Sequence, residues 1–222
     1  MSLSSFLMPG GASGMTSFFS IEYMFVFLPI AILLYWLSPQ KIRRYVLLFE
    51  SCAFFWLISG KLIAYLVLSA VLIYGFGLWI EKVNEKKKEA IHDLDRDEKK
   101  KIKKQFTARL RLVLALAAVI QIGGLLVLKY SAFAAGNINS LLALMNVGVR
   151  VGIPKFIMPI GISFFTLQAV SYLVDVYRGK IQADKNFLRV FLWLSFFPQI
   201  VEGPICRYSQ TAEQLWRAAV SY

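Results

Sequence analysis

The stretch PIGISFFTLQAVSYLVDVYRG (Pro159–Gly179) decides the fold, because it is apolar enough to enter a membrane yet carries polar side chains in register. These side chains occupy positions i, i+3, i+4 and i+7, namely Gln168, Ser171, Tyr172 and Asp175. Such positions share one face of a helix, so the segment predicts a helix with a single polar stripe. Polar groups inside hydrocarbon are costly, and the stripe is expected to face protein or water. Hydrogen bonding between helices, pairing of Asp175 with Arg178, and lining of a substrate path are the open roles.

A second stretch, SFFPQIVEGPICRY (Ser195–Tyr208), ends an apolar run with residues that interrupt helices. Its polar and helix-breaking residues are Pro198, Gln199, Glu202, Gly203, Pro204 and Arg207. The prolines predict that a helix over Phe187–Phe197 kinks or unwinds across Gln199–Gly203. A broken helix at membrane depth is tolerated only where it lines a cavity or is buried in protein. Mutual pairing of Glu202 and Arg207 is the simpler alternative to a functional role.

The composition is that of a membrane protein whose charge is concentrated in one place. The 222 residues are 58% apolar and 15% aromatic, with a formal net charge of +12. Between Glu81 and Arg111 lie 12 of the 25 Lys and Arg residues and 7 of the 13 acidic residues. Nucleic-acid binding would require a folded basic face, whereas these charges form a single loop, so no nucleic-acid partner is expected. Cys52 and Cys206 lie in apolar sequence and are interpreted as small buried hydrophobes.

The apolar segments predict an all-α, polytopic integral membrane helix bundle, because about 20 apolar residues are needed to span the hydrocarbon. About six spans are expected: Ile21–Leu37, Tyr45–Ser59, Leu62–Ile80, Leu110–Leu128, Phe156–Val176 and Phe187–Val201. The second and third are expected to form a tight hairpin around Gly60. Ser131–Gly152 is too polar to span and predicts a short interfacial or re-entrant helix. The last helix is expected to be kinked or broken, residues 1–19 to form a flexible leader, and residues 20–222 to form one domain.

The distribution of Lys and Arg predicts the orientation, because these residues prefer cytoplasmic loops. Basic clusters at 41–44, 81–111 and 178–185 then lie inside, and the amino terminus lies outside the cell's inner (cytoplasmic) membrane. The loop Glu81–Arg111 alternates acids and bases at helical spacing, so it is expected to extend its flanking helices as a solvated pair and anchor the topology. His92, the only histidine, lies in this charged loop and is not expected to be catalytic.

Two quoted segments carry a resemblance to a known family. PIGISFFTLQAVSYLVDVYRGKI and NFLRVFLWLSFFPQIVEGPICRY closely resemble the paired signatures of the membrane-bound O-acyltransferases, in the branch that contains the alginate O-acetylation membrane protein and the teichoic-acid D-alanyl transfer protein. The resemblance extends from about Phe19 to the end and is generic outside these signatures. It implies a ring of tilted helices around a tunnel that joins an intracellular acyl donor to an acceptor on the other face.

This resemblance assigns roles to the residues singled out above. The stripe and the broken segment, together with Arg178, would line the tunnel and its inner mouth. The family's catalytic histidine follows both signatures and is expected beyond residue 222, so the chain is interpreted as an amino-terminal portion that is inactive alone. Lack of a positioned base forfeits about 10²–10⁴-fold in rate.

The resemblance also implies substrates and partners. The complete enzyme is expected to move an acyl group, acetyl by analogy with the branch, from acyl-CoA or an acyl-carrier protein to an extracytoplasmic polysaccharide hydroxyl. An envelope acyl-transfer partner protein is expected besides the lipid bilayer, and no bound cofactor or metal.

Two other classes of function are open. A transporter or flippase-like bundle would use the broken helix as a substrate site, but it predicts inverted internal symmetry, and the first and last three spans show no convincing repeat. A non-catalytic structural half of a split acyltransferase would instead co-purify with a separate chain that carries the base.

Overall fold

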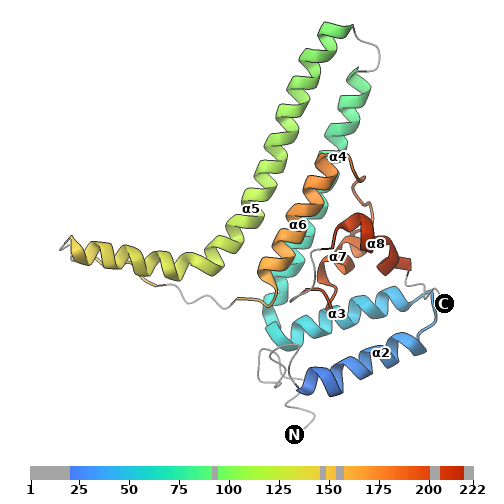
Figure 1. Ribbon diagram of the computed structural model, residues 1–222, viewed down its shortest axis with the longest axis vertical. Helices are drawn as coiled ribbons and strands as arrows, with labels where there is room; N and C mark the ends of the chain where they lie inside the picture. Colours follow the sequence, from blue (N-terminus) through green and yellow to red (C-terminus); the bar gives the residue numbers. More distant parts are fainter. Residues whose placement is uncertain (1–20, 92–94, 146–148, 154–157, 201–205, 218–222) are drawn as a thin grey trace.

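Figure 1 shows the computed structural model of the chain, which describes residues 21–91, 95–145, 149–153, 158–200 and 206–217. These residues are helical or irregular and include no strand, which confirms the all-α class. The elements in chain order are η1 (Tyr23–Phe27), α2 (Leu28–Leu37), α3 (Arg43–Ser59), η2 (Gly60–Leu62), α4 (Ile63–Ile91), α5 (Arg96–Leu144), α6 (Ile162–Tyr177), α7 (Phe187–Ser195) and α8 (Tyr208–Arg217). The predicted leader over 1–19 lies outside the described residues.

Helix α4 is the central element, packed against both α5 and α6. A buried polar pair joins α4 to α5: Ser69 Oγ donates to Gln121 Oε1 at 3.0 Å, and Gln121 Nε2 donates to the Ser69 carbonyl at 3.1 Å. Both side chains are thereby satisfied where water is excluded. The remaining contact surface of α4 consists largely of small and branched apolar residues.

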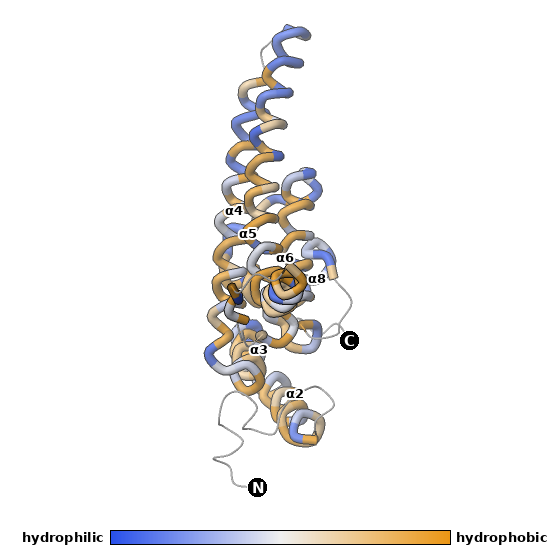
Figure 2. Tube along the Cα trace, turned by 90° about the vertical axis from the view of Figure 1, so that its left-hand side faces the viewer, coloured by the Kyte–Doolittle hydropathy of each residue, from blue (hydrophilic) through white to orange (hydrophobic). Residues whose placement is uncertain are grey.

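The charged segment between 81 and 111 extends the flanking helices as a solvated pair, as predicted. Helix α4 continues to Ile91 and α5 begins at Arg96, and both helices change from apolar to polar along the same direction (Figure 2). Lys87 Nζ donates to Thr107 Oγ1 at 3.3 Å across the pair. His92 lies outside the described residues, so its predicted lack of a catalytic role is untested.

The predicted separate helix over 131–152 is wrong in its bounds, because α5 runs on without a break to Leu144. Its last part turns away steeply from the rest of the helix (Figure 1). The adjacent glycines Gly123 and Gly124 lower the cost of bending within α5. Asn139, one of the polar residues that argued against a span, holds the following segment: its side chain donates to the Val151 carbonyl at 2.8 Å and accepts from the Val151 amide at 2.7 Å.

The hairpin predicted around Gly60 is also wrong. Figures 1 and 2 show α3 crossing the lower end of α4 rather than running beside it. Gly60 has a φ of 55° and opens the 3₁₀ turn η2, which turns the chain through a corner. Helix α3 then packs against α7 and α8. Ser59 Oγ accepts a 2.9 Å hydrogen bond from the Ile160 amide, which fixes the corner to the segment before α6.

The last two predicted spans are shorter as helices than the sequence suggested. Helix α6 begins only at Ile162 and has 16 residues, and α7 has 9 and ends at Ser195. The predicted interruption is therefore confirmed over the described residues, but α7 ends two residues before the expected end at Phe197. Residues 196–200 form a turn in which the amides of Gln199 and Ile200 donate to the Phe196 carbonyl at 3.0 and 3.1 Å. Phe197 in this turn packs on Phe27 and Phe54 with ring centroids 5.5 and 5.7 Å apart.

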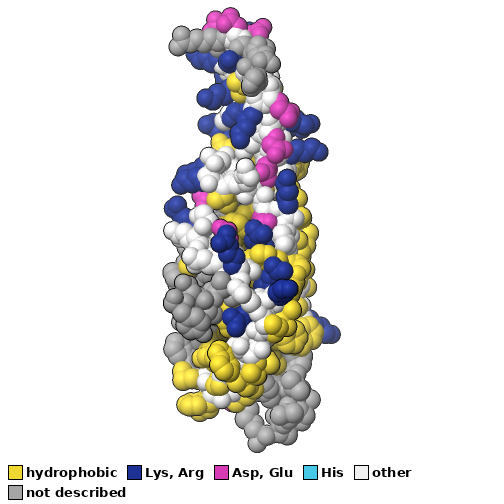
Figure 3. Space-filling view, turned by 90° about the vertical axis from the view of Figure 1, so that its right-hand side faces the viewer, with side chains coloured by type: hydrophobic (Ala, Val, Ile, Leu, Met, Phe, Trp, Pro, Cys, Tyr) yellow, Lys and Arg dark blue, Asp and Glu magenta, His cyan; other side chains and the backbone are white. Residues whose placement is uncertain are grey.

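Two helical runs, Arg43–Ile91 and Asp97–Leu144, are long and apolar enough to cross a membrane. Large apolar side chains are exposed along η1, α2 and α5 in particular, among them Phe25, Trp36, Leu112 and Val119. Figure 3 shows apolar side chains over the lower part of the molecule and Lys and Arg over the upper part. Water-soluble proteins rarely expose apolar surface on this scale, so these features support a membrane location. The number of spans stays a prediction.

The turn after α7 makes a testable demand on Gly161, which precedes α6. Gly161 and Gly179 have φ of 69° and 67°, so an alanine at either position carries backbone strain of about 1 kcal/mol. A Cβ at Gly161 would lie 2.2 Å from the Ile200 carbonyl oxygen, whereas a Cβ at Gly179 meets nothing within 4 Å. We expect Gly161→Ala to lower the free energy of unfolding by about 1–3 kcal/mol more than Gly179→Ala, measured in detergent. Equal losses would contradict the packing of this turn on α6.

Candidate functional site

The polar stripe of α6 faces protein, as predicted. Gln168, Tyr172 and Asp175 are buried, and Ser171 is half-buried. Gln168 Nε2 donates to the Trp193 carbonyl of α7 at 3.1 Å, which is a bond between helices. Within the described residues, Asp175 and Arg178 form no ion pair, and Arg178 is exposed. Gln168 therefore has a structural role, and its role in lining a tunnel stays a prediction.

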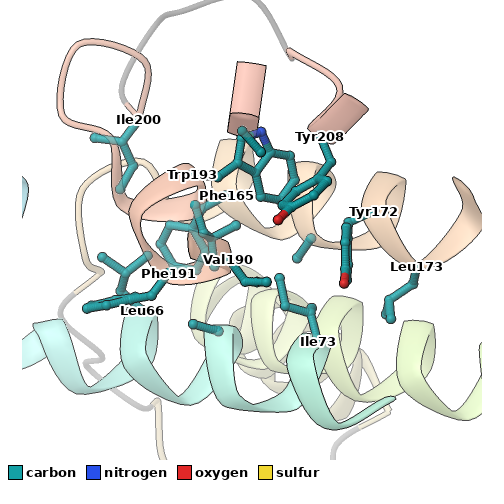
Figure 4. Packing of buried hydrophobic residues seen from close by; sticks show 14 of the residues in the cluster. Leu66, Ile73, Phe165, Tyr172, Leu173, Val190, Phe191, Trp193, Ile200 and Tyr208 are labelled. Atoms are coloured by element: carbon teal, nitrogen blue, oxygen red, sulfur yellow. The ribbon is translucent and has the colours of Figure 1, made fainter. Parts of the chain in front are cut away.

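Tyr172 joins α6 to four other parts of the chain. Its hydroxyl accepts a 3.0 Å hydrogen bond from the Asp184 amide. A Cβ at Gly77 of α4 would lie 3.0 Å from the tyrosine ring, so the absence of a side chain there lets α4 and α6 approach closely. The ring packs on Trp193 and Tyr208 with centroids 6.0 and 4.8 Å away (Figure 4).

Asp184 is the residue that sequence reasoning missed. Its Oδ2 accepts a hydrogen bond from the Tyr208 hydroxyl and lies 3.3 Å from Arg189 Nε, and its Oδ1 accepts from the Asn186 amide at 2.7 Å. The carboxylate thus links the loop after α6 to α7 and α8. The sequence analysis placed Asp184 in a basic cytoplasmic loop and considered only the Lys and Arg residues of that loop. The signal available was the spacing of Asp184 and Asn186 before α7, which is typical of a local side-chain turn and a helix cap.

The environment of Tyr208 makes it a hydrogen-bond donor. Burial, and then the hydrogen bond to Asp184, raise the pKa of Tyr208 well above its ordinary value. The phenol therefore keeps its proton throughout the physiological pH range.

Asn186 caps the first turn of α7 by accepting from the amides of Leu188 and Arg189 at 3.0 and 3.4 Å. We call Tyr172, Asp184, Arg189 and Tyr208 the Asp184 cluster.

The broken segment after α7 is buried in protein where it is described. The Phe197 amide donates to Ser51 Oγ of α3 at 3.3 Å. Gln199 is buried, whereas Pro198 is exposed. Arg207 is exposed, while Glu202, Gly203 and Pro204 lie outside the described residues, so their predicted pairing and lining roles are untested. Over residues 196–200, the amides of Phe197, Gln199 and Ile200 therefore have partners within the protein.

Two hollows adjoin predicted site residues. One has a volume of about 360 Å³ beside the break and is lined by Tyr35, Leu47, Phe196, Gln199, Thr211, Gln214 and Leu215. We call it the break hollow. A second, of about 510 Å³, lies between α4 and the loop after α6, and Arg178 is among its lining residues. Gln199 and Arg178 thus line different hollows, and their place on one tunnel stays a prediction.

Glu50 of α3 is a second residue that the sequence analysis did not select. The side chain is 4% exposed, and its Oε1 has no hydrogen-bond partner among the described residues. Buried polar groups without partners are rare in native proteins, and an acid within an expected membrane span is a candidate functional residue. The sequence signal was available, because Glu50 is an acid in the middle of an expected span.

The described residues offer polar groups that can bind and position a ligand. They include no histidine, and no group of three or more His, Cys, Asp or Glu side chains in them could hold a metal ion. The Asp184 cluster holds helices together, and the break hollow offers amide and hydroxyl groups beside apolar walls. This arrangement can bind a small ligand with few charges.

Comparison with known proteins confirms the resemblance. Proteins named "Probable alginate O-acetylase AlgI" from Pseudomonas syringae pv. tomato and Pseudomonas aeruginosa are each 28% identical to this chain, over 197 and 200 residues. Each match covers 89% of this chain and 34% of the relative, so the chain spans about a third of the relatives' length. A "Peptidoglycan O-acetyltransferase" from Helicobacter pylori is 31% identical over 130 residues, covering 48% of this chain and 23% of that protein. No family model matches the chain, and no solved structure matches it significantly.

The Asp184 cluster predicts a measurable coupling between α8 and the loop. In a double-mutant cycle of Tyr208→Phe and Asp184→Ala, we expect a coupling free energy of about 1.5–3 kcal/mol, because the bond involves a carboxylate. Chemical denaturation in detergent measures the four free energies of unfolding. The matched control cycle replaces Tyr208→Phe with Tyr65→Phe, since Tyr65 is an exposed tyrosine of α4. A coupling no larger than that of the control would contradict the cluster.

Glu50 gives a prediction of opposite sign. We expect Glu50→Leu to raise the unfolding temperature in detergent by a few degrees, because it removes a buried carboxyl whose Oε1 has no partner. The control is Glu213→Leu, which removes an exposed carboxylate paired with Arg217 and should change stability by less than about 1 kcal/mol. A loss of stability in Glu50→Leu would show that the carboxyl is satisfied.

Proposed function

Because the chain is related to alginate O-acetylases over nearly nine-tenths of its length, we propose that it forms the amino-terminal part of a membrane-bound O-acyltransferase. The whole protein would transfer an acetyl group from a cytoplasmic acyl-CoA or acyl-carrier protein to a hydroxyl of an extracytoplasmic polysaccharide. The reaction forms an ester bond to the acceptor oxygen, breaks the bond between the acyl carbon and its carrier, and removes the hydroxyl proton. The base that takes this proton is expected in the part of the protein that follows both signatures.

The similarity to the O-acetylases is the observation that carries this proposal. It covers 89% of this chain, so at most about 25 residues lie outside it, and it therefore includes the polar stripe of α6 and helix α7. A peptidoglycan O-acetyltransferase shares part of the same region, which supports a polysaccharide acceptor. The same relatives favour acyl transfer over the transporter interpretation.

The break hollow is the proposed contribution of this chain to the substrate path. Gln199 and Thr211 supply polar groups there, and Leu47 and Leu215 supply apolar walls, which suits a short acyl group on a polar carrier or acceptor. The turn at 196–200 is held by α3 and α6, so the hollow is positioned by rigid elements. The Asp184 cluster would act as a support for α8, which forms one wall.

The proposal is tested in cells that lack the gene. We expect deletion to lower the O-acetyl content of the exported polysaccharide, measured by mass spectrometry, and the full-length protein to restore it. If the O-acetyl content of the polysaccharide is unchanged after deletion, the assignment is overturned. Protein abundance in membranes is measured in parallel.

The break hollow is tested with two variants on the same helix. Gln214→Trp places a bulky ring in the hollow, whereas Gln210→Trp places the same ring on an exposed position of α8 outside it. We expect the first variant to lower acetyl transfer about ten- to a hundredfold at equal abundance, because small displacements near a reacting group have large effects on rate. Normal transfer by Gln214→Trp would remove the hollow from the substrate path.

A further inference from the structure

A third hollow lies between α4 and α5, apart from the break hollow and the Asp184 cluster. Its volume is about 450 Å³, and it is lined by Leu78, Trp79, Lys82, Val83, Lys86, Phe106 and Arg109. The lining contains three cations and no acid, although acids and bases alternate along this pair of helices. We call it the basic hollow.

The cations of the basic hollow are free to bind an anion. Lys82 and Lys86 are one turn apart on α4, and Arg109 comes from the facing helix α5, so the three side chains approach from two elements. All three are exposed, and no carboxylate among the described residues is ion-paired with any of them. The nearby Lys87 instead bonds to Thr107, which holds the two helices in place.

The floor of the hollow is apolar. Val83 is 4% exposed, Leu78 and Phe106 are partly buried against the core, and the Trp79 ring stacks on Phe76 with centroids 6.0 Å apart. A free inorganic anion gains nothing from such a floor. A ligand that joins a phosphate to a hydrocarbon chain uses both the cations and the floor.

The hollow also lies at the depth where a phospholipid headgroup is found. On α4 the apolar run ends at Ile80, two residues before Lys82, and on α5 Arg109 lies three residues before the uninterrupted apolar run that begins at Leu112. Figure 2 shows that α4 and α5 change from apolar to polar at a similar height. Basic pockets between helices at this border attract anionic headgroups, and tryptophan prefers the same interface.

We propose that the basic hollow binds the headgroup of an anionic phospholipid, with the phosphate held by Lys82, Lys86 and Arg109 and the first part of an acyl chain along Leu78 and Trp79. The bound lipid would fix the depth of the α4–α5 pair in the membrane. This inference is independent of acyl transfer, because none of these residues lines the break hollow.

The test measures lipid binding to the full-length protein in detergent by native mass spectrometry. The probes are dioleoylphosphatidylglycerol, dioleoylphosphatidylcholine and the soluble headgroup glycerol 1-phosphate. We expect the first bound molecule of phosphatidylglycerol to bind at least about tenfold more tightly than the first bound molecule of phosphatidylcholine. The triple variant K82Q/K86Q/R109Q is expected to lose on the order of a hundredfold in its affinity for phosphatidylglycerol. The control K100Q/K101Q/K104Q removes the same charge from exposed positions of α5 outside the hollow and should stay within about twofold.

Three outcomes would overturn the proposal. Equal affinity for the two lipids would show that the headgroup charge does not contribute to binding. Equal losses in the two triple variants would show that net charge, rather than this hollow, attracts the lipid. Displacement of phosphatidylglycerol by glycerol 1-phosphate at matched concentration would assign the hollow to a soluble phosphate. The unfolding temperatures of the variants, compared with the wild type, confirm that each one is folded.

Discussion

The turn that follows α7 is the constraint on which the rest of the structure depends. A chain that enters a membrane cannot leave backbone groups without partners, so an interrupted helix must be buried in protein or line a cavity. Here Ser51 accepts from the Phe197 amide, Gly161 lets α6 approach the Ile200 carbonyl, and Phe27 packs on the Phe197 ring. Four helices therefore meet at one interruption. Their crosswise arrangement follows, because α3 must cover the turn instead of lying along α4.

Several buried polar residues of the bundle pair across elements, whereas Glu50 does not. Ser69 with Gln121, Gln168 with the Trp193 carbonyl, and the Asp184 cluster each tie helices together. Glu50 is buried with an oxygen that has no hydrogen-bond partner among the described residues, a property that it shares with a few other buried atoms such as Ser131 Oγ and Trp193 Nε1. Among these groups Glu50 is the acidic one, and a buried carboxyl is costlier to leave without a partner than a hydroxyl or an indole.

The proposed acyl transfer and the proposed lipid site occupy different parts of the same scaffold. The break hollow lies between α2, α3 and α8, whereas the basic hollow lies on the α4–α5 pair at the border of the apolar surface. The central helix α4 connects them, because it packs on α5 on one side and on α6 and α7 on others. An arrangement of this kind lets one part of the molecule be anchored in the interface while another shapes a substrate path.

Much of the fold could be predicted because hydrocarbon imposes local rules. Apolar run length predicted helices, proline predicted the end of α7, and the spacing of the α6 stripe predicted that it faces protein or water. Local rules could not predict which way the chain turns after a glycine, so the predicted hairpin at Gly60 was wrong. They also could not predict that α5 continues through polar residues, where Asn139 has Val151 as a partner. The sequence by itself determined helices, a membrane location and a family resemblance, because each depends on residue type and spacing along the chain. Only the tertiary structure decided that Asp184 joins α8 to the bundle and that Gln199 and Arg178 line different hollows, because these contacts join residues that sequence spacing does not relate.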